Sequence, residues 1–307
     1  MRAVFLGTPD FAVPSLKALA AQHEIVAVFT QPDRPKGRGG QLAESPVKVA
    51  ARELGITVHQ PERVRRTESL ELLKSLAAEI MVVVGYGQII PQSIIDLPAR
   101  GILNVHASLL PKYRGAAPIQ WAIAKGETET GVTIMRIDAG LDTGDILRKA
   151  SLTIGDDETA PELSARLAPL GAELLLQTIE ADPAAEKQND ADATLAPILK
   201  KEDALIDWTR VSGDIYNRFR GFNPWPGAYT GFRGQQLSVT SMKPVAGMSS
   251  LKPGECTVQG KRWIVGCGHG STLELQEVQL AGKKRMSGEA FLNGYKFASE
   301  EILGVTV

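Results

Sequence analysis

The sequence predicts a doubly wound, Rossmann-like α/β domain with a parallel sheet, followed by a small OB-like β-barrel. Two observations predict the first domain. Short apolar runs alternate with segments of helical periodicity, which is typical of α/β sheets. The run 81–84 is apolar on both faces, as buried parallel strands are. From residue 206 onward, short segments separated by turns favour a barrel instead.

The elements follow in order along the chain. Strands of the first domain are expected at 2–7, 24–30, 79–84, 102–106 and 131–137. Helices are expected near 11–21, 45–54, 67–78, 114–125 and 160–180. Residues 181–197 are rich in Ala, Asp, Pro, Gln and Asn, which indicates a linker. After it we expect one helix at about 210–221 and strands at 236–242, 254–259, 263–266 and 272–278.

These expectations define three regions. We predict an N-terminal domain over 1–188, a linker over 189–205 and a C-terminal barrel over 206–307. A chain of 307 residues is long enough for two ordinary domains, each with its own core. Neither an internal repeat nor a low-complexity tract interrupts this pattern.

The composition favours a soluble protein of the cytoplasm. Hydrophobic residues make up 43% and charged residues 22%, as in ordinary globular proteins. No apolar run reaches the ~18 residues that a membrane span needs. The chain enters a strand at Arg2 without the features of a signal peptide. The two cysteines, Cys256 and Cys267, have no zinc-site spacing, and a reduced compartment fits them best. A monomer is the default expectation.

Charge is distributed unevenly along the chain. Residues 1–203 carry a net charge of −5 and residues 204–307 a net charge of +4. This asymmetry has two interpretations: ordinary surface variation, or a polyanionic partner for the basic C-terminal region.

An amide, an imidazole and a carboxylate stand out as a candidate catalytic set. Asn104 and His106 close a short buried strand, and residues i and i+2 of a strand point to one face. Asp142 lies in the glycine-containing turn 138–145, which follows the next strand. Such a set can stabilise an oxyanion and move a proton near neutral pH. Asp138 and Asp145 are further candidates, with turn capping as their simpler interpretation.

Two other kinds of site fit the sequence poorly. A nicotinamide cofactor would call for G-x-G-x-x-G after the first strand, and only Gly7 is present there. A zinc site would need more ligands than His106 and its surroundings supply, so we expect no metal. The remaining histidines, His23, His59 and His269, lie in polar contexts that favour solvated side chains.

Two basic clusters suggest contacts with nucleic-acid phosphates. The loop 31–40 follows the second strand, and we expect it to lie over the candidate site. A second cluster lies on the predicted barrel. The candidate phosphate-binding cations of the two clusters are Arg34, Lys36, Arg38, Arg218, Lys283, Lys284 and Arg285.

Taken together, these motifs resemble those of the folate-dependent formyltransferase family, and the tRNA-formylating branch in particular. The resemblance covers nearly the whole chain in the expected order. The pair Asn-x-His and Leu-Asp-Thr-Gly-Asp is specific to the wider family. The cationic loop and the basic barrel indicate the tRNA branch. The segments that carry the resemblance are 7–11, 31–38, 104–111, 114–120, 141–145 and 223–227.

The resemblance implies a reaction and a set of roles. 10-Formyltetrahydrofolate would give its formyl group to the α-amino group of methionine on initiator tRNA, and no membrane takes part. Asn104, His106 and Asp142 would be catalytic. The folate-binding positions would be Ser108, Leu109, Leu110, Pro111, Tyr86, Gly87, Gln88, Ile89, Asp138 and Gly140. The 31–40 loop would insert at the acceptor stem of the tRNA, and the barrel would hold the backbone of the stem.

Three alternatives remain open, and one position departs from the family pattern. An amino-sugar nucleotide N-formyltransferase would share the catalytic set, whereas a glycinamide ribonucleotide formyltransferase would lack the barrel. An RNA-binding protein on an inactive formyltransferase body is the third alternative. Family members often carry lysines after Gly-Arg-Gly of the basic loop, where this chain has Gly40-Gln41. This departure bears on tRNA affinity more than on identity.

Overall fold

The structure is a computed structural model that describes residues 1–36, 41–295, 297 and 301–304. The chain forms two compact units, each assembled from several segments. Unit 1 comprises 1–119, 129–154 and 162–198. Unit 2 comprises 120–128, 155–161 and 199–307.

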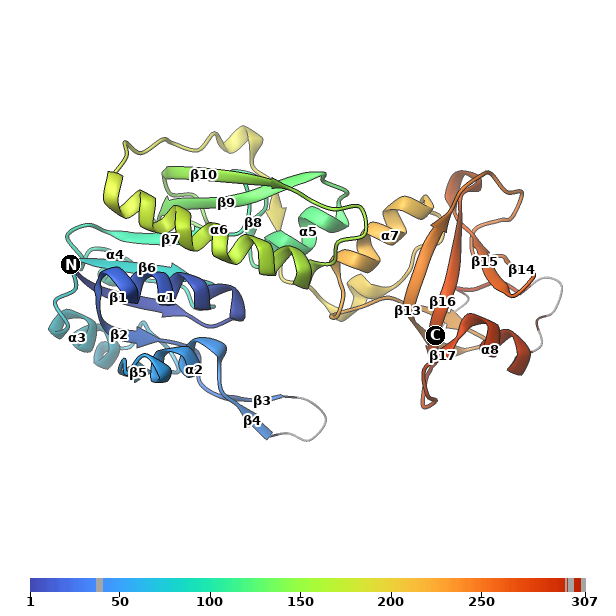
Figure 1. Cartoon of the computed structure of the whole chain (residues 1–307), viewed down its shortest axis with the longest axis horizontal. Helices are drawn as coiled ribbons and strands as arrows, with labels where there is room; N and C mark the ends of the chain where they lie inside the picture. The colour runs from blue at the N-terminus through green and yellow to red at the C-terminus, as the bar shows by residue number, and fades with distance from the viewer. Residues whose placement is uncertain (37–40, 296, 298–300, 305–307) are drawn as a thin grey trace. The chain divides into compact units, whose positions relative to one another are not determined.

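Unit 1 is built on a seven-stranded sheet whose centre is parallel (Figure 1). Its strand order is β10-β9-β7-β6-β1-β2-β5. The parallel strands are β1 (Arg2–Gly7), β2 (Glu24–Phe29), β5 (Val58–His59), β6 (Ile80–Val84) and β7 (Ile102–His106). Every residue of β6 and β7 is buried, which agrees with the predicted apolar runs.

The predicted parallel sheet is confirmed at its centre, but one edge of it is antiparallel. Strand β9 (Glu129–Arg136) runs antiparallel to β7, and β10 (Ile146–Thr153) runs antiparallel to β9. The turn 137–145 joins β9 directly to β10, and a connection this short joins antiparallel strands only. Half-buried and exposed residues alternate along β10 from Arg148 onward, as on an edge strand with one face in solvent.

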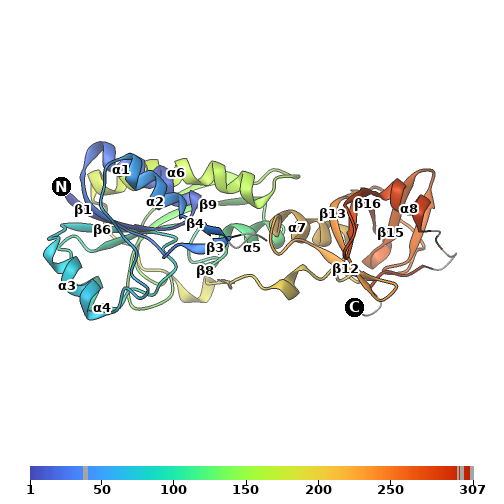
Figure 2. The same ribbon diagram turned by 90° about the horizontal axis from the view of Figure 1, so that it is seen from below.

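Helices cover both faces of the sheet (Figure 2). One face carries α1 (Val13–Gln22), α2 (Pro46–Glu53) and α6 (Ala160–Ala181). The other carries α3 (Thr67–Ser75) and α4 (Gln92–Ile95). A short 3-10 helix, η1 (Asp10–Ala12), precedes α1.

Close packing of α6 fixes the direction of the side chains on β7. A Cβ atom at Gly171 of α6 would lie 2.8 Å from Cγ1 of Val105. Val105 therefore faces α6, and because side chains alternate along a strand, Asn104 and His106 face the opposite side. This is the side of the sheet that α3 and α4 cover in part (Figure 2).

Two small strand pairs complete unit 1. Strands β3 (Arg34–Lys36) and β4 (Gln41–Ala43) pair as a hairpin, and β8 (Arg114–Gly115) pairs in parallel with β11 (Leu195–Ala196). The predicted helix at 114–125 begins only at Pro118, in α5 (Pro118–Ala124). Residues 114–115 instead pair with β11. In addition, Ala117 directly precedes Pro118, and a residue in that position disfavours helical backbone.

Unit 2 contains a curled antiparallel sheet with strand order β12-β13-β16-β15-β14, and β17 pairs with β16 (Figure 1). The strands are β12 (Tyr229–Phe232), β13 (Gln235–Val245), β14 (Cys256–Gln259), β15 (Arg262–Gly266), β16 (Thr272–Leu280) and β17 (Met286–Ser287). The helices are α7 (Ser212–Gly221), α8 (Gly288–Gly294) and η4 (Gly268–Gly270). Two 3-10 helices, η2 (Asp190–Asp192) in unit 1 and η3 (Lys201–Ala204) in unit 2, precede α7.

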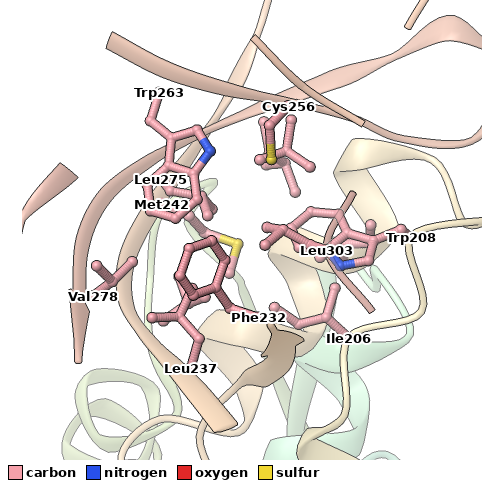
Figure 3. Close-up of a cluster of buried hydrophobic side chains, with 14 of the residues drawn as sticks. Ile206, Trp208, Phe232, Leu237, Met242, Cys256, Trp263, Leu275, Val278 and Leu303 are labelled. Atoms are coloured by element: carbon pink, nitrogen blue, oxygen red, sulfur yellow. The ribbon is translucent and has the colours of Figure 1, made fainter. Parts of the chain in front are cut away.

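The core of unit 2 is an aromatic and aliphatic cluster inside the curl of this sheet (Figure 3). The Trp263 indole is fully buried and stacks on Phe291, with ring centroids 5.0 Å apart. Phe232 meets Phe291 edge to face at 5.1 Å. At one side of the cluster, the indole N–H of Trp208 donates to the hydroxyl of Thr230 at 2.9 Å. These contacts give unit 2 its own hydrophobic core.

Trp263→Ala should therefore destabilise unit 2 by about 3–5 kcal/mol, because it removes a fully buried aromatic side chain. Trp225→Ala is the matched control, since 57% of that residue is exposed. We expect the control to change the free energy of unfolding by less than about 1 kcal/mol. Urea denaturation followed by fluorescence and circular dichroism measures both variants. An equal loss of unfolding free energy in the two variants would contradict this view of the core.

Candidate active site

The carboxylate of Asp142 is the meeting point of the predicted catalytic set. Its Oδ2 accepts the backbone N–H of Gly115 at 2.8 Å, and its Oδ1 accepts the side-chain amide of Asn104 at 3.4 Å. Nδ1 of His106 lies 3.7 Å from the same Oδ2. The structure thus brings Asn104, His106 and Asp142 together.

Strand β7 places the amide of Asn104 and the imidazole of His106 in a buried environment. Asn104 is 9% exposed and His106 is 5% exposed. Nε2 of His106 lies 3.0 Å from the carbonyl oxygen of Tyr113. Because a carbonyl only accepts, Nε2 carries the proton in this hydrogen bond, and the Nδ1 edge faces Asp142. Charge that develops here is stabilised more strongly than it would be in water.

The turn that carries Asp142 reaches the site by a route that the sequence did not predict. In a parallel sheet, the strand before this turn would end on the same edge as His106. Strand β9 is instead antiparallel to β7, and its last residue, Arg136, pairs with Leu103 near the start of β7. The chain of residues 137–145 then returns to the middle of β7, where Asp142 meets Asn104.

The turn stabilises itself through Asp138 and two glycines. Oδ1 of Asp138 accepts the backbone N–H of Gly140 at 3.0 Å and the hydroxyl of Thr143 at 2.7 Å. A Cβ atom at Gly140 would lie 1.9 Å from Oγ1 of Thr143, and one at Gly144 would lie 1.9 Å from the Arg136 carbonyl oxygen. Steric crowding within the protein itself therefore explains why both positions are glycine. Asp142 has a left-handed backbone with φ of 52°, a conformation that aspartate tolerates better than most residues.

In the predicted folate-binding segment 108–111, some of the side chains make contacts within the protein itself. Ser108 is fully buried and its hydroxyl donates to the carbonyl oxygen of Lys112 at 2.6 Å. Leu110 packs in a small apolar cluster with Met135 and Ile146. Leu109 and Pro111 are half-buried.

The segment 86–89 also divides its residues between core and surface. The Tyr86 ring is buried, and burial raises the pKa of its hydroxyl. The Gln88 side chain accepts from the backbone N–H of Val64 and donates to the carbonyl of Pro61. Gly87 is exposed, and Ile89 is 88% exposed. The segment therefore presents backbone and one apolar side chain to the surroundings.

The predicted phosphate-binding cations have different environments. Arg34 lies exposed on β3, Lys36 ends that strand, and Arg38 lies outside the described residues. In unit 2, Lys283, Lys284 and Arg285 form an exposed turn between β16 and β17; here Arg285 lies 3.6 Å from a carboxylate oxygen of Glu277.

Arg218 differs from these exposed cations. Its guanidinium lies 4.9 Å from the Phe222 ring centroid and donates to the carbonyl of Asp203 at 2.9 Å. Burial lowers the pKa of this guanidinium. Packing within unit 2 thus accounts for Arg218 without any ligand.

An ion-pair cluster holds the base of the β3–β4 hairpin. Nζ of Lys48 lies 2.5 Å from Oδ2 of Asp33, just before β3, and 3.2 Å from Glu44, just after β4. The Gln60 amide donates to Oδ1 of Asp33 at 2.7 Å. Hydrogen bonds from Lys48 and Gln60 lower the pKa of the Asp33 carboxyl. Both ends of the hairpin are therefore fixed to α2.

Two other kinds of feature are absent from the described part of the chain. No group of three His, Cys, Asp or Glu side chains there is arranged to hold a metal ion. None of the described helices combines the length and the apolarity that a membrane crossing needs.

Sequence reasoning missed two residues that contact the Asp142 turn. Gly115 donates its backbone N–H to the carboxylate, and Gln188 donates its side-chain amide to the carbonyls of Asp142 and Gly144. Gly115 follows the predicted segment at 104–111, within the 114–120 motif. Gln188 lies in the stretch whose composition indicated a linker, so no local signal pointed to it.

Comparison with known proteins places the chain in a family. The family model "Formyl transferase" matches residues 1–179, and "Formyl transferase, C-terminal domain" matches residues 198–296. A methionyl-tRNA formyltransferase of Solibacter usitatus is 56% identical over 99% of both chains. One of Geobacter sulfurreducens is 49% identical over 99% of this chain and 97% of its own. The chain belongs to the methionyl-tRNA formyltransferase family.

Solved structures share the formyltransferase fold. A sugar 3N-formyl transferase, solved with dTDP and 5-N-formyl-THF, matches with a TM-score of 0.68 at 19% identity, covering 92% of this chain and 99% of its own. A methionyl-tRNA formyltransferase from Clostridium thermocellum matches with a TM-score of 0.56 at 17% identity, covering 91% of this chain and 98% of its own. At such identities these matches show the fold alone.

The hairpin anchor predicts a pH-dependent loss of stability in Asp33→Asn. The lowered pKa of Asp33 means that its pairing stabilises the fold above the ordinary carboxyl pKa, and that this stability is lost as the pH falls through the lowered value. We expect a cost of about 1–2 kcal/mol at pH 7 that disappears as the pH falls through the lowered pKa of Asp33.

Denaturation across pH measures this effect. Glu71→Gln is the matched control, because the Glu71–Lys74 pair is largely exposed and should contribute little. A loss in Asp33→Asn that stays constant from neutral pH to the lowest pH at which the protein is still folded would contradict the ionic anchor.

Proposed function

We propose that the protein transfers the formyl group of 10-formyltetrahydrofolate to the α-amino group of methionine on initiator tRNA. The observation that carries this proposal is the Asp142 carboxylate held beside Asn104 and His106. Support also comes from relatives at 47–56% identity over nearly the full chain, which are named for this activity. The products would be formylmethionyl-tRNA and tetrahydrofolate.

The proposed chemistry begins with the amine. An α-amino group has a pKa near ~8, so much of it is charged at pH 7 and must lose a proton before it attacks. The Asp142 carboxylate would accept this proton, directly or through water. A bond then forms between the methionine nitrogen and the formyl carbon, and this nitrogen releases its second proton to water. The result is a tetrahedral intermediate with a developing oxyanion.

The two side chains of β7 would stabilise that oxyanion and assist its collapse. The Asn104 amide carries two N–H groups, and its bond to Asp142 uses one of them. A single oxyanion donor is typically worth about 2.7–4 kcal/mol. Protonated His106 would also donate to the oxygen and would then supply a proton to the folate nitrogen as the bond from that nitrogen to the formyl carbon breaks.

The binding surfaces are part of the same proposal. Folate would lie against the backbone of 86–89 and 138–142 and beside 108–111. The hairpin with Arg34 and the exposed turn 283–285 would contact phosphates of the tRNA. Two domains, over 1–188 and 206–307, an OB-like class for the C-terminal sheet, a cytoplasmic location and a monomeric state complete the proposal.

The deciding experiment offers the purified protein 10-formyltetrahydrofolate and one of two amines. With charged initiator methionyl-tRNA, formylmethionine should appear after mild base hydrolysis. An amino-sugar nucleotide is the competing substrate, and transfer only to that amine would replace the proposed substrate while keeping the site. Failure to transfer to either amine would contradict the proposed reaction.

Asn104→Asp should lower kcat by about 10²–10³, because it removes an oxyanion donor and adds a negative charge. The Kd for folate should change far less, since the contact is made mainly in the transition state. Turnover and equilibrium binding of a folate analogue measure the two effects. Asn293→Asp, an exposed position on α8, is the matched control. Unchanged turnover in Asn104→Asp would exclude the donor role.

Arg34→Ala should weaken tRNA binding and flatten its salt dependence. One lost phosphate contact reduces the slope of log Kd against log salt by about 1. Arg65→Ala, another exposed arginine of unit 1, should keep the wild-type slope. Filter binding of initiator tRNA at several salt concentrations gives the slopes. Identical slopes for the two variants would argue against a phosphate contact at Arg34.

A further inference from the structure

The segment 186–196 contacts the turn that carries Asp142 and the strand β8 beside the candidate site. Glu186 and Ile146 form an antiparallel bridge at the start of β10. Thr194 accepts the backbone N–H of Arg114 at 2.9 Å through its carbonyl, and its hydroxyl accepts the N–H of Tyr113 at 2.9 Å. Leu195 and Ala196 then pair with β8 as strand β11. This segment is therefore part of the packed structure of unit 1.

Gln188 in this segment hydrogen-bonds to the backbone of the turn that carries Asp142. Its Nε2 donates to the carbonyl oxygens of Asp142 and Gly144, each at 2.8 Å. Its Oε1 accepts from Nε and Nη2 of Arg114 at 3.0 and 2.8 Å. Both amide hydrogens and the amide oxygen are thus used. The orientation is fixed, because a flipped amide would set its oxygen against two carbonyls and its NH₂ against a guanidinium.

Arg114 binds the oxygen of this amide, on the side away from the Asp142 turn. Its side chain is 8% exposed, and a buried cation needs partners to offset the loss of water. Apart from Gln188, it donates to Oδ1 of Asp190 at 2.8 Å, and the Asp190 side chain is 82% exposed. The guanidinium thus links a surface carboxylate to the amide that binds the catalytic turn.

Three consecutive residues join this arrangement to the proposed catalytic groups. The carbonyl of Tyr113 accepts from His106, the side chain of Arg114 holds Gln188, and the N–H of Gly115 binds the Asp142 carboxylate. At Gly115, φ is 125° and a Cβ atom would lie 2.6 Å from the carbonyl oxygen of Ala196. Only glycine lets β8 approach β11 this closely.

We propose that Gln188, oriented by Arg114, is a positioning residue that holds Asp142 in its left-handed conformation with the carboxylate directed at Asn104 and His106. This inference rests on the proposed function for its effect on turnover. Asp142 is bound on both sides: Gln188 holds its carbonyl and Gly115 holds its carboxylate. A displacement of about 1 Å in such a group can cost about 10²-fold in rate.

Gln188→Glu tests the proposal without removing bulk. The carboxylate still pairs with Arg114, so the buried cation keeps a partner, but both donors to the turn are lost. We expect kcat to fall by about 10–100-fold, with KM for folate and for tRNA changed by less than about threefold. Gln177→Glu, the same substitution on the exposed side of α6, is the matched control and should keep wild-type turnover.

Hydrogen exchange of three backbone amides supplies a readout that is independent of formyl transfer. The Gly115 amide reports its bond to the Asp142 carboxylate, whereas the Arg114 and Ala117 amides bond to Thr194 and Ala196 and report the attachment of segment 186–196. In Gln188→Glu we expect the Gly115 amide to exchange about tenfold faster or more, with the other two unchanged.

Each outcome decides the matter. A fall in kcat with acceleration confined to Gly115 supports the positioning role. Acceleration shared by all three amides, an unchanged Gly115 amide, or a kcat within about threefold of wild type overturns it. If wild-type protein transfers no formyl group, the proposed function fails, and the exchange pattern alone still tests whether Gln188 holds Asp142 against Gly115.

Discussion

The Asp142 carboxylate is the constraint on which the candidate site depends. A backbone N–H from β8 and a side-chain amide from β7 donate to it, and the imidazole edge of His106 faces it. Because Asp142 lies in a left-handed turn, its position is determined by these bonds rather than by regular secondary structure. The turn, β8 and the segment 186–196 are all arranged around this one residue.

The sheet explains why this arrangement can be rigid. Strands β6 and β7 are buried along their whole length, and α6 packs so closely on Val105 that glycine is needed at position 171. Asn104 and His106 therefore project from a fully buried strand of unit 1, on the face opposite α6. Preorganised donors in a dry setting cost little reorganisation when charge develops, which is the property that the proposed acyl transfer needs.

The sequence predicted those parts of the structure that depend on local pattern. Each of the five strands predicted for the first domain lies within about two residues of an observed strand, because a buried apolar run can be recognised from the local sequence alone. The i, i+2 spacing of Asn104 and His106 also correctly placed them on one face. The antiparallel direction of β9 was missed, since burial does not reveal strand direction. Gln188 was missed because its partners lie more than 40 residues away in the chain.

The most direct test of this account is the single-turnover rate of formyl transfer to initiator methionyl-tRNA by Asp142→Asn. Asparagine keeps the shape of the side chain and an oxygen that can accept from Gly115, but it cannot take the amine proton. We predict a rate lower by about 10² or more with folate binding retained, the size expected when a general base is lost. A rate within about threefold of wild type would contradict the central role of this carboxylate.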